Sequence, residues 1–353
     1  MPPQAKLNAA IIGCGRIGST FEDILQTQKP HSHAGAYAAH PNVSLVAGCD
    51  QDNKVAHDFG ERWSVKAYKD YISMLRSEKV ELLSICTPPQ THMQIIKDAI
   101  LYGKDLKLIW CEKPITVSLD EAHTVAKLID DSKIKLAINY WRRWDPLHNK
   151  IAVALSEGVI GTPHTLFCQA HVGIVNTCTH MFDLIKQYTG SDIKSIYADI
   201  IADGSDDPGG TLQLVLENNL HAFIDCNWKE KQRFGMSIWG EKGNISAFSD
   251  GVLLNDFTVN TSQTKWKPKH FFRNTQEFNS PMYLAVDNFV DVVFKKAPLM
   301  CDINNGLDTL KLAVGAHISS AKNELMCLRD LSYYYDDAII LGCRSTSLTR
   351  DGK

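Results

Sequence analysis

The sequence predicts an α/β protein in two parts, a doubly wound parallel sheet followed by a second α/β domain built on a different kind of sheet. In the first half, short continuous apolar runs alternate with segments of helical periodicity, as in a parallel sheet covered on both faces. In the second half, strand-like runs mostly follow one another directly, which indicates an antiparallel or mixed sheet. A length of 353 residues also favours two domains.

Composition and charge exclude several classes of partner. The chain is 44% hydrophobic with a formal net charge of -3, and it has no basic stripe, so we expect no nucleic acid partner. It has no apolar run of membrane-spanning length and no signal peptide pattern at its N-terminus, so we expect no membrane partner. Its ten cysteines are scattered without a CxxC pair, which favours a reduced, cytoplasmic protein with no disulfide frame and no metal site.

Five apolar runs are the predicted strands of the first sheet, and three segments between them are the predicted helices. The strands cover residues 7–12, 44–49, 81–86, 106–111 and 135–138, and the helices cover 53–63, 90–103 and 118–131. Ser118 followed by Glu121 is a capping box at the start of the third helix. Because ligands bind outside the carboxyl ends of the strands in such sheets, the residues after each strand are candidate site residues.

The first predicted strand ends in a glycine motif of the form G-x-G-x-x-G. In this motif the first glycine permits a tight turn, the second lets the backbone approach a pyrophosphate, and the third allows close packing of helix on strand. The helix that follows offers N–H groups to an anion. On its own the motif also fits an ordinary glycine turn. The cofactor contacts that it predicts come from Gly13, Gly15, Arg16, Ile17 and Gly18.

Asp50 follows the second predicted strand, where an acidic residue can accept hydrogen bonds from a ribose. The same carboxylate would repel a 2′-phosphate, so NAD is favoured over NADP as the cofactor. Alternatively, Asp50 caps the helix that starts near residue 53. Its separation from Gly18 exceeds the usual ~20 residues, and we assign the excess to an inserted loop at 22–32, after which the helical pattern resumes at 33–37.

The second half begins near residue 144, so the predicted domains are 1–143 and 144–353. Asp145 and Pro146 suit the N-cap and first position of a helix that runs to about residue 158. Strand-like runs follow at 165–171, 193–202, 211–217, 221–227 and 235–239, and helical patterns at 177–188, 282–295 and 304–325. A further edge strand is predicted at 338–341.

From about residue 7 to residue 325 the chain resembles the glucose–fructose oxidoreductase, inositol dehydrogenase and rhizopine-catabolism (Gfo/Idh/MocA) family of NAD(P)-dependent dehydrogenases. The most specific pieces are a strand ending in Thr87-Pro88-Pro89 with His92 beyond it, and a later strand ending in Glu112-Lys113-Pro114. The resemblance implies a Rossmann domain and an α/β domain with a large, mostly antiparallel sheet that is often used for oligomerisation. We therefore expect a homo-oligomer, a dimer or tetramer formed through this sheet.

Lys113 is the candidate proton carrier for hydride transfer at an alcohol or ketone. A free lysine titrates near 10.4, but burial and a neighbouring nicotinamide cation would both lower that value. The resemblance implies that Lys113 contacts the reacting hydroxyl, that Pro114 fixes the turn, commonly through a cis bond, and that Glu112 lies near the nicotinamide ribose. It also places Thr87 and Pro88 beside the ribose and nicotinamide. His92 then supports the cofactor cleft or lies on a helix surface.

In the second half, the resemblance implies that His180 points at the substrate hydroxyl with a partner four residues earlier. That partner is commonly an aspartate, whereas this chain has Asn176, which cannot act as a base although it can hydrogen-bond. Asn176 is also a good helix N-cap, so both roles stay open. Asp183 can orient His180, and Thr179 is a further candidate for substrate contact.

Trp141, Arg142 and Arg143 follow the last strand of the first domain and are candidate substrate contacts. An aromatic face and a guanidinium fork suit a sugar ring with an acidic or phosphorylated substituent, although the tryptophan also suits a packing cluster at a hinge. Three residues at predicted strand ends are weaker candidates, namely His171, Asn227 and Trp228.

The function that these residues predict is an NAD-dependent dehydrogenase acting on a hydroxyl or keto carbon of a sugar, cyclitol or sugar derivative. Catalysis is assigned to Lys113 and His180, with Asn176 in support. Asn176 also leaves open a non-catalytic, nucleotide-binding sensor of the same fold. Reduction of a non-sugar carbonyl is a third possibility, because the sheet that would line the substrate site has no readable motif.

Overall fold

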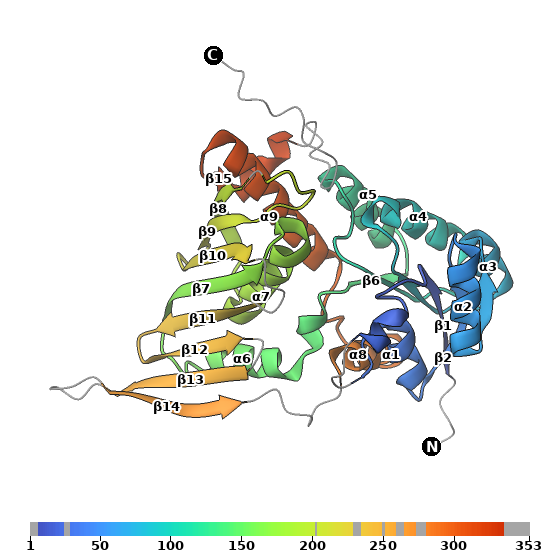
Figure 1. Ribbon diagram of the computed structural model, residues 1–353, viewed down its shortest axis with the longest axis horizontal. Coiled ribbons are helices and arrows are strands. Elements are labelled where there is room, and N and C mark those ends of the chain that lie inside the picture. The colour runs from blue at the N-terminus through green and yellow to red at the C-terminus, as the bar shows by residue number, and fades with distance from the viewer. Residues whose placement is uncertain are drawn as a thin grey trace, which may run out of the picture. The chain divides into compact units, whose positions relative to one another are not determined.

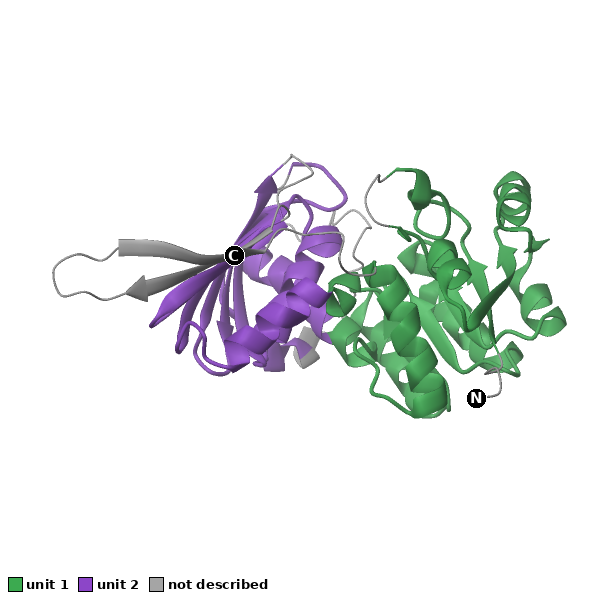
Figure 2. Cartoon of the chain, turned by 90° about the horizontal axis from the view of Figure 1, so that it is seen from below, with its two compact units in different colours: residues 1–145, 276–307 green, residues 146–275, 308–353 purple. Residues whose placement is uncertain are grey.

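The computed structural model describes residues 6–24, 29–201, 203–228, 234–248, 251–258, 265–272 and 280–334. The chain divides into two compact units, residues 1–145 with 276–307 and residues 146–275 with 308–353 (Figure 2). The first division lies close to the predicted boundary after residue 143. The return of 276–307 to unit 1 was not predicted. Phe289 explains it, because its ring packs edge-on against Trp110 and Trp144 of unit 1, at centroid distances of 5.1 and 5.7 Å.

Unit 1 is built on a parallel sheet of six strands, in the order β3-β2-β1-β4-β5-β6 (Figure 1). All five strands predicted from the apolar runs form, and β3 is the additional one, short and partly exposed at the sheet edge. This is the doubly wound order, whose direction reverses between β1 and β4. The strands are β1 (Leu7–Ile12), β2 (Val43–Cys49), β3 (Lys66–Tyr68), β4 (Leu82–Ile85), β5 (Leu108–Cys111) and β6 (Lys135–Ile138).

The helices of unit 1 begin at polar caps. Asp52 caps α2, Asp70 caps α3, and the predicted cap Ser118 accepts a hydrogen bond from Glu121 N of α5 at 3.3 Å. The helices are α1 (His33–Ala39), α2 (Asn53–Trp63), α3 (Tyr71–Ser77), α4 (His92–Tyr102), α5 (Leu119–Asp130) and α8 (Pro281–Lys295). Short 3-10 turns lie at η1 (Thr20–Asp23), η2 (Pro89–Thr91) and η3 (Trp141–Trp144).

Unit 2 is built on a sheet of nine strands, in the order β14-β13-β12-β11-β7-β10-β9-β8-β15 (Figure 1). All neighbouring pairs are antiparallel except β7 and β10, so the expected mostly antiparallel sheet is confirmed. The strands are β7 (Pro163–His171), β8 (Ile193–Ile200), β9 (Gly210–Leu216), β10 (His221–Trp228), β11 (Phe234–Gly240), β12 (Gly243–Phe248), β13 (Gly251–Thr258), β14 (Lys265–Phe272) and β15 (Met326–Cys327).

One face of this sheet is buried and the other is open, as the alternation along β7 shows. Leu166 and Cys168 are buried, whereas Phe167 between them is 52% exposed. The helices of unit 2 are α6 (Pro146–Ser156), α7 (Thr179–Thr189) and α9 (Ile303–Lys322), with a π-helical turn η4 (Ile174–Cys178) before α7 and a 3-10 segment η5 (Leu328–Tyr334) after β15. The predicted strand at 338–341 lies outside the described residues.

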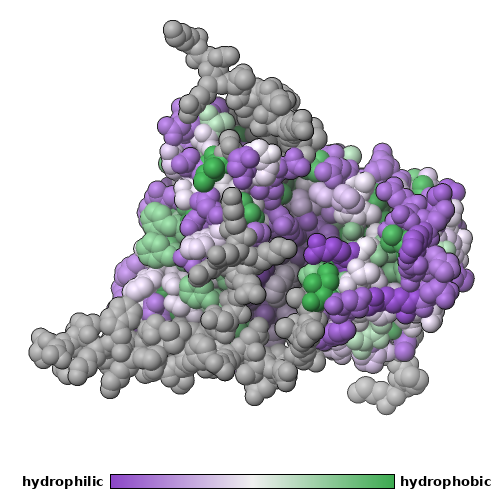
Figure 3. All heavy atoms as spheres, in the orientation of Figure 1, coloured by the Kyte–Doolittle hydropathy of each residue, from purple (hydrophilic) through white to green (hydrophobic). Residues whose placement is uncertain are grey.

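The expectations of no membrane partner, no metal site and no disulfide frame can be compared with the described residues. Hydrophilic side chains predominate on the face drawn in Figure 3. Within the described ranges, no helix combines the length and the hydropathy that a bilayer crossing requires. The same residues contain no group of three or more side chains placed to hold a metal ion, and no disulfide joins the cysteines among them.

Candidate active site

The glycine motif forms the turn that follows β1, and two of its glycines are required by sterics. Gly13 has a φ of +91°, and a Cβ there would lie 2.7 Å from the backbone of Cys86. A Cβ on Gly18 would lie 2.2 Å from the Gly13 carbonyl oxygen. Gly15 differs, because no atom lies within 4 Å of its Cβ position. The turn is therefore closed at its first and third glycines and open at the second, where a pyrophosphate would approach the backbone.

The helix after this turn is interrupted by a looped-out segment. His33 N donates to Ile17 O at 3.1 Å and Ala34 N donates to Gly18 O at 3.0 Å. In an uninterrupted helix these partners are four residues apart, whereas here they are sixteen apart, so twelve residues are extra. Without them, the separation from Gly18 to Asp50 falls from 32 to the usual 20 or so. The insertion predicted from the spacing is confirmed, and α1 begins at His33 as expected.

A buried carboxylate fixes the far end of this insertion. Glu22, 5% exposed, accepts hydrogen bonds from His31 N and Ser32 N at 2.7 Å and from Ser32 Oγ at 2.8 Å. Ser32 in turn caps α1 by accepting from Gly35 N at 3.0 Å. The first three N–H groups of α1 are taken by Ile17 O, Gly18 O and Ser32 Oγ, so the open turn around Gly15 is the part with room for an anion.

Asp50 ties the glycine turn to the end of β2. Its Oδ2 accepts from Cys14 N at 2.9 Å and its Oδ1 accepts from Asp52 N at 3.0 Å. Each oxygen keeps a lone pair for a ribose hydroxyl. The alternative role of Asp50 as the helix cap is wrong, because Asp52 caps α2 by accepting from Lys54 N and Val55 N at 2.8 and 3.2 Å.

His92 joins the turn after β4 to the turn after β5. Its Nε2 lies 2.8 Å from Thr87 O, and its Nδ1 lies 3.1 Å from Pro114 O. The side chain is buried, so the alternative of a helix-surface histidine is wrong. Burial lowers the pKa of His92, against the hydrogen bonds to these carbonyls and the charge of Glu112, which raise it. Thr91 Oγ1 closes the same turn with hydrogen bonds to Thr87 Oγ1 and Pro88 O.

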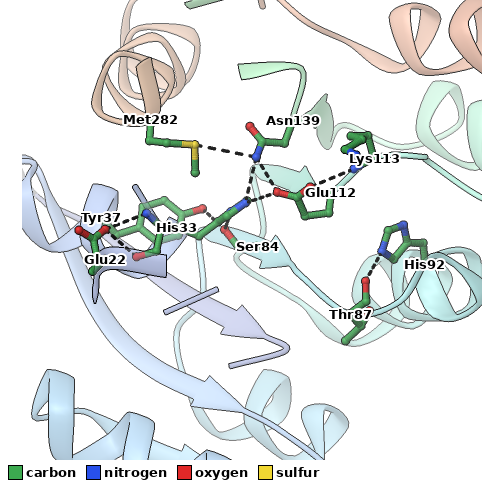
Figure 4. Close-up of polar contacts among 11 residues, drawn as sticks. Glu22, His33, Tyr37, Ser84, Thr87, His92, Glu112, Lys113, Asn139 and Met282 are labelled. Atoms are coloured by element: carbon green, nitrogen blue, oxygen red, sulfur yellow. Dashed lines mark hydrogen bonds and ion pairs between the residues drawn. The ribbon is translucent and has the colours of Figure 1, made fainter. Parts of the chain in front are cut away.

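Glu112 is held by two side chains from other parts of unit 1 (Figure 4). Its Oε1 lies 3.0 Å from His33 Nε2 of α1 and accepts from Asn139 Nδ2, which follows β6, at 2.6 Å. His33 continues the chain of contacts, because its Nδ1 lies 2.9 Å from Ser84 Oγ of β4, which lies 2.9 Å from the Tyr37 hydroxyl. The His33 ring also packs on Trp110, with ring centroids 3.7 Å apart.

These contacts decide the charge state of Glu112. Burial raises the pKa of the Glu112 carboxyl, but the hydrogen bonds from His33 and Asn139 and the positive charge of Lys113 outweigh it, so that the pKa is lowered overall. The carboxylate is therefore ionised at neutral pH. Glu112 Oε2 also accepts from Lys113 N at 3.3 Å, and Lys113 follows at the strand end, half-buried and before a cis peptide bond to Pro114, as expected.

Sequence reasoning missed His33 as a partner of Glu112, missed Ser84 and Tyr37 beyond it, and gave Asn139 no role. One signal was available. Ser84 interrupts the apolar strand β4, and a polar side chain buried in a strand needs a partner. His33 carries no comparable signal, because its neighbours in space are 51 and 79 residues away in sequence.

In unit 2, the candidate substrate residues lie on the π-helical turn and α7. Asn176 is exposed on the turn, His180 is half-buried, and Asp183 is buried. The alternative role of Asn176 as helix cap is wrong, because α7 begins at Thr179 with Cys178 in the cap position. Thr179 is buried and its hydroxyl donates to Val175 O at 2.7 Å within the helix.

Four further candidates, Trp141, Arg142, His171 and Trp228, take part in local contacts. The Arg142 guanidinium lies over the Trp141 ring, 4.2 Å from its centroid. Trp144, which sequence reasoning did not single out, is buried and donates from Nε1 to Asn288 Oδ1 of α8 at 3.2 Å. In unit 2, His171 Nδ1 contacts Trp228 O at 2.7 Å, so these two strand ends are joined.

Comparison with known proteins also points to an NAD-binding oxidoreductase. Residues 7–140 match the Gfo/Idh/MocA family, described as an oxidoreductase family with an NAD-binding Rossmann fold. The chain is 24% identical over 335 residues to the oxidoreductase YrbE of Bacillus subtilis, covering 88% of this chain and 93% of that protein. It is 23% identical over 335 residues to the inositol 2-dehydrogenase of Rhizobium meliloti, covering 88% and 96%.

Solved structures share the fold over most of the chain. The WlbA dehydrogenase of Bordetella pertussis, solved with NADH and UDP-GlcNAcA, aligns with a TM-score of 0.73 and 17% identity over 91% of this chain and 98% of that one. At this identity the likeness concerns the fold. The match over residues 7–140, together with dehydrogenases that are similar over most of the chain, identifies it as an NAD-dependent oxidoreductase whose Rossmann part, residues 7–140, is of the Gfo/Idh/MocA type.

Proposed function

We propose that the chain interconverts a hydroxyl and a keto group on a sugar, cyclitol or sugar derivative, with Lys113 and His180 in proton transfer. NAD, when bound, supplies the acceptor or donor of the hydride. Relatives named inositol 2-dehydrogenase support the class of substrate. The sensor role rests on Asn176 alone, and the non-sugar carbonyl only on the lack of a readable motif in the sheet of unit 2.

The proposal rests on the contacts that hold the backbone in place on both sides of Lys113. On one side, Glu112 is held by His33 and Asn139. On the other side, the Pro114 carbonyl contacts His92. A proton carrier must stay within hydrogen-bond reach of the reacting oxygen, so a fixed backbone at Lys113 suits this role.

The cofactor would be held along the carboxyl edge of the parallel sheet. The open backbone at Gly15, with Gly13, Arg16, Ile17 and Gly18 around it, suits the pyrophosphate, and Asp50 suits the adenosine ribose. The nicotinamide half suits the ends of β4 and β5, at Thr87, Pro88 and Glu112. His92 supports the end of β4 through its contact with the Thr87 carbonyl.

On the substrate side we assign His180 to the second proton-transfer position and Asn176 to hydrogen bonding. Asn176 is exposed on its turn and can both donate to and accept from a hydroxyl. Trp141, Arg142 and Arg143 stay candidate substrate contacts, and Thr179 supports the turn through its bond to Val175.

The test is turnover of myo-inositol, scyllo-inositol, D-glucose and related sugars with NAD, followed at the NADH absorbance. We expect turnover of at least one compound, and His180→Ala should lower kcat with little effect on the dissociation constant of NADH. Lys127→Ala, on the exposed side of α5, serves as the matched control. Failure of every sugar and cyclitol, with NADH binding intact, would contradict the proposed substrate class.

We also propose that the open face of the unit 2 sheet joins copies of the chain. Phe167 and Phe223 stack on this face with centroids 5.6 Å apart, although they are 52% and 38% exposed. Sedimentation of the wild type and of Phe167→Ser with Phe223→Ser should give an oligomer and a monomer, respectively. A monomeric wild type contradicts this proposal. The cytoplasmic location expected from the sequence stays a prediction.

A further inference from the structure

Asp207 places a carboxylate on the turn that carries Asn176. It comes from the segment between β8 and β9, and its Oδ1 accepts from Val175 N while its Oδ2 accepts from Asn176 N, each at 2.8 Å. The neighbouring residue adds a backbone contact, since Ile174 N donates to Pro208 O at 3.1 Å. The carboxylate is therefore fixed at two consecutive residues of the turn, and the backbone that follows it is fixed at a third.

The turn is shaped to admit this carboxylate. Gly173, directly before the turn, has a φ of +121°, which side chains rarely tolerate. A Cβ at Gly173 would lie 2.6 Å from Asp207 Oδ2, closer than two such atoms can approach. The glycine and the aspartate thus depend on each other, although they lie in different loops.

Among the residues that the structure describes, the ionisable groups that face Asp207 do not offset its charge. Both of its oxygens accept N–H bonds, as an ionised carboxylate does. His317 of α9 faces it, but burial lowers the pKa of His317 despite the opposing effect of Asp207. Cys178 on the turn also faces it, and the hydrogen bond with Cys226 and burial raise the pKa of that thiol. Neither group supplies a positive charge at neutral pH, and Asp206 beside it carries the same sign.

A substrate group that contacts Asn176 therefore lies next to a neutral amide and near the fixed carboxylate of Asp207. A hydroxyl group can exchange hydrogen bonds with the amide, whereas a carboxylate or phosphate there would be repelled. The N–H groups of residues 175 and 176 cannot attract such an anion, because Asp207 already occupies them. We propose that Asp207 is a specificity-determining residue that selects uncharged hydroxylated substrates over anionic ones. This rests on the proposed function and reverses the preference expected from Arg142 and Arg143.

The experiment compares uncharged and anionic compounds in matched variants. The uncharged probes are myo-inositol and D-glucose, and the anionic probes are D-glucuronate and D-glucose 6-phosphate. We expect the wild type to favour the uncharged members by at least about tenfold in kcat/KM, and Asp207→Asn to reduce that preference by about tenfold. Asp206→Asn also removes one negative charge, one residue away, and should change the preference for uncharged probes by less than about twofold. Rising salt should weaken the wild-type preference.

Three outcomes overturn the inference: a wild-type preference for the anionic probes, a preference insensitive to salt, or an Asp207→Asn variant that loses turnover equally on both kinds of probe. The last would mean a purely structural role. If Asp207→Asn does not fold, the salt series on the wild type still decides. Calorimetric measurement of the binding of the same probes, with NADH present, distinguishes the selectivity assigned to Asp207 from the proposed catalytic function. Discrimination in binding without turnover contradicts the proposed function alone, turnover without discrimination contradicts this inference alone, and no binding of any probe contradicts both.

Discussion

The imidazole of His33 and the carboxylate of Glu112 lie 3.0 Å apart, although 79 residues separate them in the sequence. The contact joins the start of α1 to the end of β5, directly before Lys113. His33 is buried and Glu112 is largely buried, and Asn139 and Ser84 complete the hydrogen bonding on either side. Lys113, the proposed proton carrier, directly follows Glu112 in the chain.

Replacement of His33 should destabilise unit 1 by removing a partner from a buried carboxylate. His33→Leu keeps much of the volume but cannot donate to Glu112, so we expect a loss of about 1–3 kcal/mol in the free energy of unfolding. His33→Gln retains a donor and should lose less. The control is Tyr37→Phe, at the far end of the chain of contacts, which leaves Glu112 untouched. Urea unfolding measures all three, and equal losses for the leucine and glutamine variants would count against the donor role.

Glu112 should make stability depend on pH in the acid range. Because its pKa is lowered in the folded protein, its contribution is fully present above the pKa of an unfolded glutamate, about 4.3, and is lost as the pH falls through the folded value. Unfolding of Glu112→Gln should therefore vary less with pH than unfolding of the wild type below about pH 4.5. Parallel curves for the two proteins would contradict the lowered pKa.

The glycines of the turn should respond differently to a methyl group. Gly13→Ala forces a side chain onto a positive φ and against the Cys86 backbone, so we expect a loss of at least about 2 kcal/mol in stability. Gly15→Ala meets no atom within 4 Å, so it should fold normally but bind NADH more weakly. Thermal unfolding and NADH fluorescence separate these effects. Normal NADH affinity in Gly15→Ala would contradict the pyrophosphate role of this glycine.

Asp50 and Asp52 should have separable roles although they are two residues apart. Asp52→Ala removes the cap of α2 and should cost about 1 kcal/mol of stability, with little effect on the choice of cofactor. Asp50→Asn removes the charge that would repel a 2′-phosphate and should narrow the difference between the dissociation constants of NADH and NADPH. An unchanged NADH to NADPH ratio in Asp50→Asn would show that another group sets the preference.

The fold was largely predictable because its signals are local. Continuous apolar runs gave the strands of the parallel sheet, and the spacing from Gly18 to Asp50 located the insertion before α1. The residues that hold Glu112 and Asn176 in place were harder to predict from the sequence, because they depend on contacts between distant segments. His33 and Asn139 reach Glu112 from two different elements, with Ser84 in contact with His33 from a third, and Asp207 reaches Asn176 from a loop with no motif. Phe289 likewise belongs to unit 1 through ring packing that no sequence period reports.

The central claim is that Lys113 carries the proton in an NAD-dependent oxidoreduction of a polyol. The most direct measurement is kcat of Lys113→Ala with and without added methylamine, on whichever sugar or cyclitol the wild type turns over. The account predicts that kcat falls by at least about a hundredfold, that the dissociation constant of NADH changes little, and that methylamine restores part of the rate. Turnover of Lys113→Ala at close to the wild-type kcat would contradict it.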